Sequence, residues 1–165
     1  SLIIFFSKLK IKKTKKLINK IHFEKISQIN NLRKIKQFST NCINHNSKFK
    51  KLIKDSQKNY TNIYGYGASA RSSTLLNFSK ISNDIKGIFD KNPMKINSFT
   101  AGSKIFIEDI KNFNKIKPDL VVILAWNFKK EIINELDKIY KYKGDYLIPI
   151  PKPKIIKYED RKKIK

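Results

Sequence analysis

The apolar positions of the chain are spaced differently before and after Tyr60. Over residues 23–56 they recur mostly at steps of three and four, which predicts a long helix with one apolar face. The cluster at 41–47 contains poor helix formers and predicts a break or a kink within that helix. Further upstream, residues 2–6 are typical of a strand, and residues 8–20 of a polar connection or a frayed helix.

After Tyr60, short apolar runs alternate with helical segments. The predicted strands are residues 62–66, 86–90, 104–107, 120–124 and 146–150, and the predicted helices are residues 69–78, 108–114 and 128–142. Such alternation indicates a parallel sheet with crossover helices, and a run that is apolar on both faces, as at 120–124, is typical of a central strand. The sequence therefore predicts an α/β fold: a Rossmann-like, mostly parallel sheet of about five strands with flanking helices, preceded by a long helix.

Length and composition limit the class of protein. The 165 residues, 40% of them hydrophobic, allow one ordinary domain with an appendage. A single cysteine, Cys42, excludes a disulfide framework and a cysteine-based zinc site within the chain. No apolar run approaches the about 18 residues of a membrane span, so we expect a cytoplasmic protein without a membrane partner. Ser1 in place of an initiating methionine predicts an internal cut or a truncated start.

The net charge of +24 raises the question of a nucleic-acid partner. The basic residues are almost all lysines accompanied by abundant Ile and Asn, a trio that shares A/T-rich codons, and arginine occurs only at Arg33, Arg71 and Arg161. Proteins that read nucleic acids tend to use arginine and stacking aromatics in a recognisable module, and the sequence contains none. We therefore interpret the lysine excess as compositional and do not expect a nucleic-acid partner. A lysine-lined phosphate-binding face remains an alternative.

The most informative candidate chemistry lies at residues 60–79, where a strand ends at a glycine pair and a helix follows. This arrangement exposes unpaired backbone N–H groups at the positive end of a helix dipole, so it readily binds an anion. The run 65–70, Gly-Tyr-Gly-Ala-Ser-Ala, fits the relaxed G-x-G-x-x-G/A dinucleotide pattern. Asp90 stands where the ribose-binding acid of an NAD site would, although both histidines, His22 and His45, lie upstream of the domain and leave no candidate partner for hydride transfer.

Each of these features also has a purely structural interpretation. The glycine pair would serve equally as a tight strand-to-helix turn without a ligand. Asp90 begins Asp-Lys-Asn-Pro, which is a good turn sequence in its own right. Both interpretations stay open at the level of sequence.

The glycine run is the first of several motifs that follow one another in a fixed order. They are GYGASARSSTLLN at 65–77, FDKNPMK at 89–95, GSKIFI at 102–107, PDLVVILAWN at 118–127 and IPIP at 148–151. In this order they resemble the C-terminal domain of sugar C-methyltransferases, S-adenosylmethionine-dependent enzymes that methylate a carbon of nucleotide-linked deoxysugars. The run SLIIFF at 1–6 resembles the strand that ends the catalytic domain of that family.

The resemblance implies that separate domains of the full-length enzyme have separate functions. In that family, an N-terminal zinc-binding domain and a central S-adenosylmethionine domain carry the cofactors and the acid/base residues, and the C-terminal domain closes over the sugar nucleotide. The chain has no acidic glycine-rich methyl-donor loop and no cysteine cluster, so we expect it to bind no cofactor and to transfer no methyl group by itself. We expect residues 1–21 to be a remnant of the methyltransferase domain, 22–59 a linking helix, 60–151 the Rossmann-like domain and 152–165 an exposed basic tail.

The expected substrate contacts come from the motifs, and no residue is expected to be catalytic. Arg71 would place a cation beside a phosphate. At the end of a central strand, Trp126 would pack on a sugar or a base, and Asn127 would hydrogen-bond a hydroxyl or a carbonyl. The full predicted substrate-binding set is Gly65, Tyr66, Gly67, Ala68, Ser69, Arg71, Thr74, Asn77, Asp90, Trp126 and Asn127.

Some of these assignments have alternatives, and the chain departs from the family pattern at two places. Trp126 would also fit a core position, and Asn127 would also cap a helix that starts at Phe128. Where the family has Lys-Gly-Asn, the chain has Arg-Ser-Ser at 71–73, and Ala125 replaces the proline before the tryptophan. A stand-alone NAD- or nucleotide-binding module and a charge-driven nucleic-acid-binding protein remain the alternative functions.

Overall fold

The computed structural model describes residues 8–9, 12–28 and 31–162. The chain forms two compact units, Ser1–Cys42 and Ile43–Lys165, and the second unit contains the sheet. The strand predicted at residues 2–6 lies outside the described residues. No helix in the described ranges is both long enough and apolar enough to span a bilayer.

Two helices precede the sheet, where the sequence predicted a polar connection or a frayed helix at 8–20 and one long helix at 23–56 with a break or a kink at 41–47. Helix α1 spans Lys15–Ile26, is capped by the Thr14 hydroxyl, and ends before Gln28, which has a positive φ of 49°. Helix α2 spans Leu32–Ser56 without interruption, so the predicted break at 41–47 is wrong. Polar residues of that cluster find partners instead: His45 Nε2 lies 2.8 Å from the carbonyl oxygen of Pro149. These contacts outweigh the low helix propensity of the cluster.

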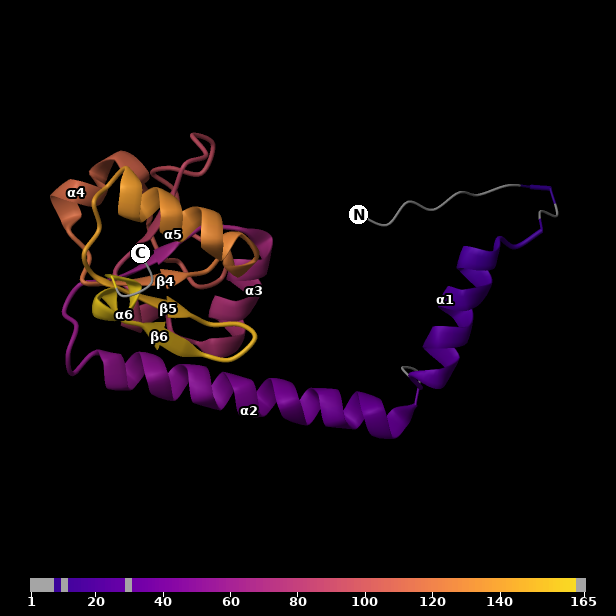
Figure 1. Ribbon diagram of the computed structural model, residues 1–165. Helices are drawn as coiled ribbons and strands as arrows, with labels where there is room; N and C mark the ends of the chain where they lie inside the picture. The colour runs from indigo at the N-terminus through magenta and orange to yellow at the C-terminus, as the bar shows by residue number, and fades with distance from the viewer. Residues whose placement is uncertain (1–7, 10–11, 29–30, 163–165) are drawn as a thin grey trace. The chain divides into compact units, whose positions relative to one another are not determined.

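The sheet has six strands in the order β3-β2-β1-β4-β5-β6, and all neighbouring pairs are parallel except β5 and β6. The α/β fold with a mostly parallel sheet is thereby confirmed (Figure 1). The strands are β1 Ile63–Tyr66, β2 Ile88–Asp90, β3 Ile107–Asp109, β4 Leu120–Ile123, β5 Asp145–Ile148 and β6 Lys154–Ile156. The helices that connect or follow them are α3 Ala70–Ser79, α4 Phe113–Ile116, α5 Lys129–Lys138 and α6 Tyr158–Lys162, with 3-10 turns η1 Ser82–Asp84, η2 Ile110–Asn112 and η3 Trp126–Phe128.

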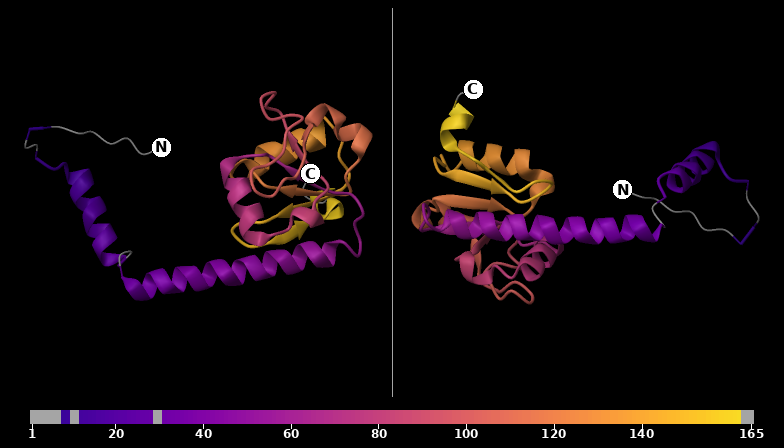
Figure 2. Two further views of the ribbon diagram at one scale, coloured as in Figure 1. Left: turned by 180° about the vertical axis from the view of Figure 1, so that it is seen from behind. Right: turned by 90° about the horizontal axis from the view of Figure 1, so that it is seen from below.

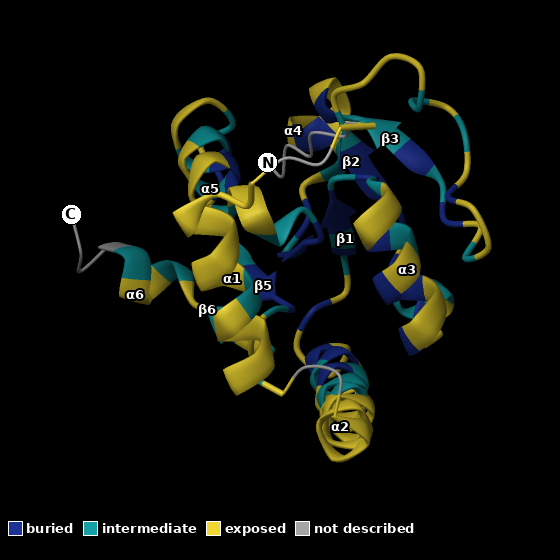
Figure 3. Ribbon diagram, turned by 90° about the vertical axis from the view of Figure 1, so that its right-hand side faces the viewer, coloured by how far each residue is buried: buried dark blue, intermediate teal, exposed yellow. Residues whose placement is uncertain are grey.

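Helices cover both faces of the sheet, so that the unit has three layers. Side chains of β4 alternate between the two resulting cores: Leu120 and Val122 face one, and Val121 and Ile123 face the other. The first core also receives side chains from α2 and α3, and the second from α4 and α5. Figure 2 (right) shows α3 and α5 on opposite sides of the strands, and Figure 3 shows buried β1 and β2 between these helices. Successive side chains of a strand point to opposite faces, so a strand with a core on each face, such as β4, buries all of them.

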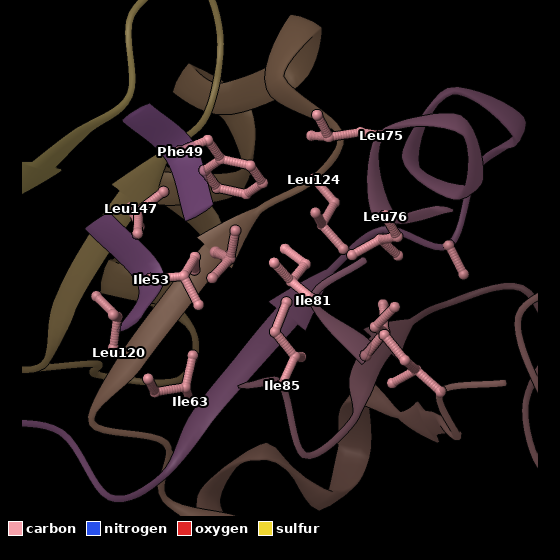
Figure 4. Packing of buried hydrophobic residues seen from close by; sticks show 14 of the residues in the cluster. Phe49, Ile53, Ile63, Leu75, Leu76, Ile81, Ile85, Leu120, Leu124 and Leu147 are labelled. Carbon is pink, nitrogen blue, oxygen red and sulfur yellow. The ribbon is translucent and has the colours of Figure 1, made fainter. Parts of the chain in front are cut away.

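The second half of α2 belongs to the packed core. Phe49 and Ile53 are fully buried and lie against Leu147, Leu120 and Ile63 of the sheet (Figure 4). The compact unit therefore begins within the helix that the sequence interpretation treated as a linker.

Residues 154–162 form a strand and a short helix against the sheet, where the sequence predicted an exposed tail. Strand β6 pairs antiparallel with β5 through Ile148, Leu147 and Tyr146. In α6, the side chain of Arg161 is only 10% exposed, forms an ion pair of 2.5 Å with Asp137, and stacks 4.2 Å from the ring centre of Tyr146. The prediction of an exposed tail is wrong for Ile155, Ile156, Tyr158 and Arg161, which pairing and packing with distant residues partly bury, while the side chains of Lys154, Lys157, Glu159 and Asp160 are exposed.

A second anchor joins the tail to the start of the sheet. The Tyr60 hydroxyl donates a hydrogen bond to the Asp145 carboxylate, and Lys157 Nζ lies 2.9 Å from the same carboxylate and 2.6 Å from the Tyr60 hydroxyl. The backbone N–H of Tyr158 donates to the other Asp145 oxygen at 2.8 Å. This Tyr60–Asp145–Lys157 cluster ties the segment before β1 to the segment after β6.

Candidate functional site

The candidate site lies at the carboxyl ends of β1 and β4. These strands are neighbours at the centre of the sheet, and the chain leaves them in opposite directions, toward β2 and toward β5. Ligands of open α/β sheets bind at such a switch in strand order. An open pocket of about 50 Å³ occupies this position and is lined by Ser69, Arg71, Leu124, Ala125, Trp126, Asn127 and Phe128.

The glycine turn is required by the backbone itself. Gly67 has a φ of +94°, and a Cβ there would lie 2.7 Å from the Cβ of Ala125. A Cβ at Gly65 would lie 2.7 Å from Leu124 Cδ1. Both glycines are therefore explained by close packing of β1 against the end of β4, with or without a ligand.

Some backbone N–H groups at the start of α3 are hydrogen-bonded within the helix cap, and others are available to an anion. Ser69 is the N-cap: its hydroxyl accepts from the N–H of Ser72 at 3.2 Å, and the Ser72 hydroxyl accepts from the N–H of Ser69 at 2.6 Å. Ser72, which replaces the family glycine, is fully buried and completes this capping box. The first-turn N–H groups that remain, with no hydrogen-bond acceptor among the described residues, are those of Ala70 and Arg71.

Four residues of the predicted set line the pocket: Ser69, Arg71, Trp126 and Asn127. Arg71 and Asn127 are exposed, and Trp126 is half-buried against the core beneath the pocket. The N-cap of α5 is Phe128, and no side chain caps that helix, so the alternative role of Asn127 as a cap is wrong. The core interpretation of Trp126 is confirmed only in part, because its side chain also lines the pocket.

The interpretation of Asp90 as the start of a turn is confirmed by its hydrogen bond with Asn92, and its contact with Ala68 is one that the sequence did not indicate. Its Oδ2 accepts from the N–H of Ala68 at 2.7 Å, and its Oδ1 accepts from the N–H of Asn92 at 2.9 Å. Lys95 Nζ lies 4.0 Å from Asp90 Oδ2 and donates to the carbonyl oxygen of Ala68 at 2.7 Å. The Asp90 carboxylate thus holds both the glycine turn and its own loop.

Three further predicted residues, Tyr66, Thr74 and Asn77, do not line the pocket. Tyr66 is buried in the core on the α5 side, where burial first and then the nearby Glu135 carboxylate raise the pKa of its phenol. Thr74 donates back to the carbonyl oxygen of Ala70 within α3. Asn77 donates to the carbonyl oxygen of Ala101 at 2.9 Å and supports that loop.

Three pocket residues were not in the predicted set: Leu124, Ala125 and Phe128. Phe128 is 58% exposed, although an aromatic residue at the start of a helix is ordinarily assigned to the core. The sequence feature that could have identified Phe128 as a pocket residue is its position two residues after Trp126, within the turn that follows β4. Only the path of that turn shows that both aromatic side chains line one pocket.

The family of the chain follows from its sequence relatives. Residues 1–151 match the model of the C-methyltransferase C-terminal domain. The chain belongs to this family. Over 98 residues, 59% of its length, it is 31% identical to the C-methyltransferase NovU of Streptomyces niveus, and the aligned part spans 23% of that relative.

This C-methyltransferase C-terminal domain does not fit the cofactors that the resemblance implies for a full-length enzyme. Zinc requires a cluster of Cys, His, Asp or Glu ligands, and no group of three or more such side chains gathers within residues 8–9, 12–28 and 31–162. S-adenosylmethionine would require the acidic glycine-rich loop that the sequence lacks.

Proposed function

We propose that this domain binds the substrate of a longer, S-adenosylmethionine-dependent C-methyltransferase of the cytoplasm, a nucleotide-linked deoxysugar, and transfers no methyl group alone. The observation that carries the proposal is the pocket at the ends of β1 and β4, which joins Arg71, Trp126 and Asn127 in a chain of the C-methyltransferase family. Such a combination of a cation, an aromatic face and an amide suits a ligand with phosphate, ring and hydroxyl groups.

Each group has a proposed role. The diphosphate would lie at the N-terminus of α3, beside the N–H groups of Ala70 and Arg71 and the Arg71 guanidinium. Trp126 and the exposed Phe128 would pack against the base or the sugar, and Asn127 would hydrogen-bond a hydroxyl. Asp90, already engaged by two backbone N–H groups, is less suited to a ribose than the dinucleotide pattern suggested.

The size of the pocket supports a role as one wall of a larger site. Its volume of about 50 Å³ is small beside the roughly 300–1,000 Å³ of a typical ligand pocket. We propose that the remaining walls belong to the methyl-donor portion of the enzyme. Within the chain, residues 1–21 would derive from that portion, and residues 22–59 would connect it to the substrate-binding domain at 60–151.

The proposal is tested by titrating the chain with dTDP and with NAD, followed by calorimetry. We expect weak binding of dTDP, with a Kd on the order of 1 mM for a single wall. Arg71→Gln should weaken it by about tenfold or more, because a charged hydrogen bond is lost. Arg33→Gln, which removes the same charge from the exposed start of α2, is the matched control and should leave the Kd unchanged.

The same titration discriminates the alternatives. No dTDP binding, or equal effects of the two arginine variants, would contradict the proposed site. NAD binding that Asp90→Asn abolishes would favour a stand-alone dinucleotide-binding module. Binding to any DNA with a steep dependence on salt would favour a charge-driven nucleic-acid-binding protein.

A further inference from the structure

The loop after β2 holds one residue of the glycine turn from two sides. Asp90 accepts from the N–H of Ala68 at 2.7 Å, and Lys95 donates to the carbonyl oxygen of the same residue at 2.7 Å. The loop is itself closed by the N–H of Asn92 on Asp90 and by the N–H of Met94 on the Asn92 side chain at 3.0 Å. The segment at 90–95 therefore forms a backbone clamp on Ala68.

The clamp acts where the turn passes into the helix. Ala68 is buried, and the next residue, Ser69, is the N-cap of α3. Since the direction of the Ala68 peptide groups sets the course of the chain into the first turn, the clamp fixes where the free N–H groups of Ala70 and Arg71 lie.

The clamp also places a negative charge next to a site suited to an anion. The Asp90 side chain is only 14% exposed, so water screens its charge poorly. A carboxylate this close to the turn would repel a phosphate, unless a cation compensates it. Lys95, with Nζ 4.0 Å from Asp90 Oδ2, is that cation.

We propose that Lys95 is a positioning residue for the anion at the start of α3. It acts through Ala68 and Asp90: it holds the Ala68 carbonyl oxygen, and it cancels the carboxylate charge, so that Asp90 can hold the Ala68 N–H without repelling the ligand. The inference rests on the proposed function for the identity of the anion, and it gives the Asp-Lys-Asn-Pro-Met-Lys segment a role in shaping the site instead of binding a ribose.

The test uses the one tryptophan of the chain. Because Trp126 lines the pocket, its fluorescence reports binding of dTDP there. We expect Lys95→Met to raise the Kd for dTDP by about tenfold, since one like-charge contact is then uncompensated. Lys91→Met is the matched control: it removes the same charge from the same loop, but Lys91 pairs with Glu135 on α5. We expect its Kd to stay within about twofold of wild type.

A double variant separates positioning from direct contact. Asp90→Asn with Lys95→Met removes both charges while an amide oxygen can still accept from Ala68, so we expect the Kd to return to within about threefold of wild type. If Lys95 touched the ligand itself, the double variant would bind as weakly as Lys95→Met, and the positioning role would be overturned. Equal binding by Lys95→Met and Lys91→Met would overturn it as well.

Hydrogen exchange keeps the inference distinct from the proposed function. The Ala68 amide should exchange faster in Lys95→Met than in Lys91→Met, while the melting temperatures of the two variants stay similar. If wild type shows no response to dTDP, the proposed function fails. The clamp is contradicted by a separate result, equal exchange rates of the Ala68 amide in Lys95→Met and Lys91→Met, whatever the response to dTDP.

Discussion

At the residue scale, Gly67 shows why a glycine motif alone says little about a ligand. Its positive φ and the approach of Ala125 both exclude a side chain. The N–H of Gly67 donates to the carbonyl oxygen of Phe89 at 2.8 Å, so this turn is also joined to β2. The glycine is needed to build the fold, and the same close packing brings the end of β4 to the start of α3.

Gly67→Ala should therefore destabilise the domain by about 2–4 kcal/mol, the combined cost of a left-handed alanine and of overpacking against Ala125. Urea denaturation measures the loss. Adding Ala125→Gly removes the steric part and should restore roughly half of it, leaving the cost of the positive φ. A Gly67→Ala variant as stable as wild type would contradict the geometry of the turn.

At the element scale, the apolar face of α2 is buried in the second half of the helix and exposed in the first half. Phe38 and Phe49 lie eleven residues, or about three turns, apart and so share a helix face. Phe49 is fully buried, whereas Phe38 is 69% exposed. The helical spacing that predicted this helix cannot distinguish the two, because periodicity records a face and not what covers it.

Phe49→Ala should lower the free energy of unfolding by about 3–5 kcal/mol, because it leaves a cavity against the sheet. Phe38→Ala, the matched control, should change it by less than about 0.5 kcal/mol. Chemical denaturation followed by circular dichroism compares them. A loss at Phe38 as large as that at Phe49 would show that the exposed half of the apolar face is covered in solution.

The element boundaries show which parts of the fold are local. Four of the five parallel strands were predicted within a few residues, because each is a short apolar run between turn residues, as at 120–124. The strand predicted at 104–107 shares only Ile107 with β3, and the helix predicted from Glu108 begins after Asp109. Strand β6 was missed because Pro151 and Pro153 argue against a strand there, and only its partner β5 makes one. The prediction of a break at 41–47 was wrong for the same reason. Helix propensity depends on neighbouring residues, whereas the contact of His45 with Pro149 joins residues far apart in the sequence.

The candidate site was predictable to a similar extent. Ser69, Arg71, Trp126 and Asn127 meet because β1 and β4 are neighbours, which follows from the strand order of a Rossmann-like fold. The engagement of Asp90 by Ala68 could not be predicted, since it depends on how closely a loop approaches a turn 22 residues away in sequence.

At the scale of the whole molecule, the Tyr60–Asp145–Lys157 cluster makes stability depend on pH. Burial alone would raise the pKa of Asp145, but hydrogen bonds from Tyr60, Lys157 and the Tyr158 N–H lower it below its ordinary value. The folded state therefore favours the carboxylate. Its stabilisation is present at neutral pH and is lost as the pH falls below about 4.

Asp145→Asn should lower the free energy of unfolding at pH 7 by about 1.5–3 kcal/mol, because charge-assisted hydrogen bonds are lost. It should also flatten the fall in stability between pH 5 and pH 2, taken as roughly the range over which such a carboxylate titrates. Asp55→Asn is the control, since Asp55 makes an exposed pair with Lys58 and should alter neither quantity. Urea denaturation at several pH values provides the comparison, and parallel pH profiles for wild type and Asp145→Asn would contradict the assignment.

The ordered tail has a consequence for how the molecule meets other chains. Strand β6, which is short, begins at Lys154 and follows Pro153, pairs with the side of β5 that β4 leaves free. At the opposite margin, backbone hydrogen bonds join Asn97 and Ser98 to Ile107 of β3. An incoming strand from another polypeptide would therefore find only the short outer edge of β6 at one margin and a partly covered β3 at the other. We expect association to use side chains on helices and loops, where single substitutions can alter a partner without disturbing the sheet.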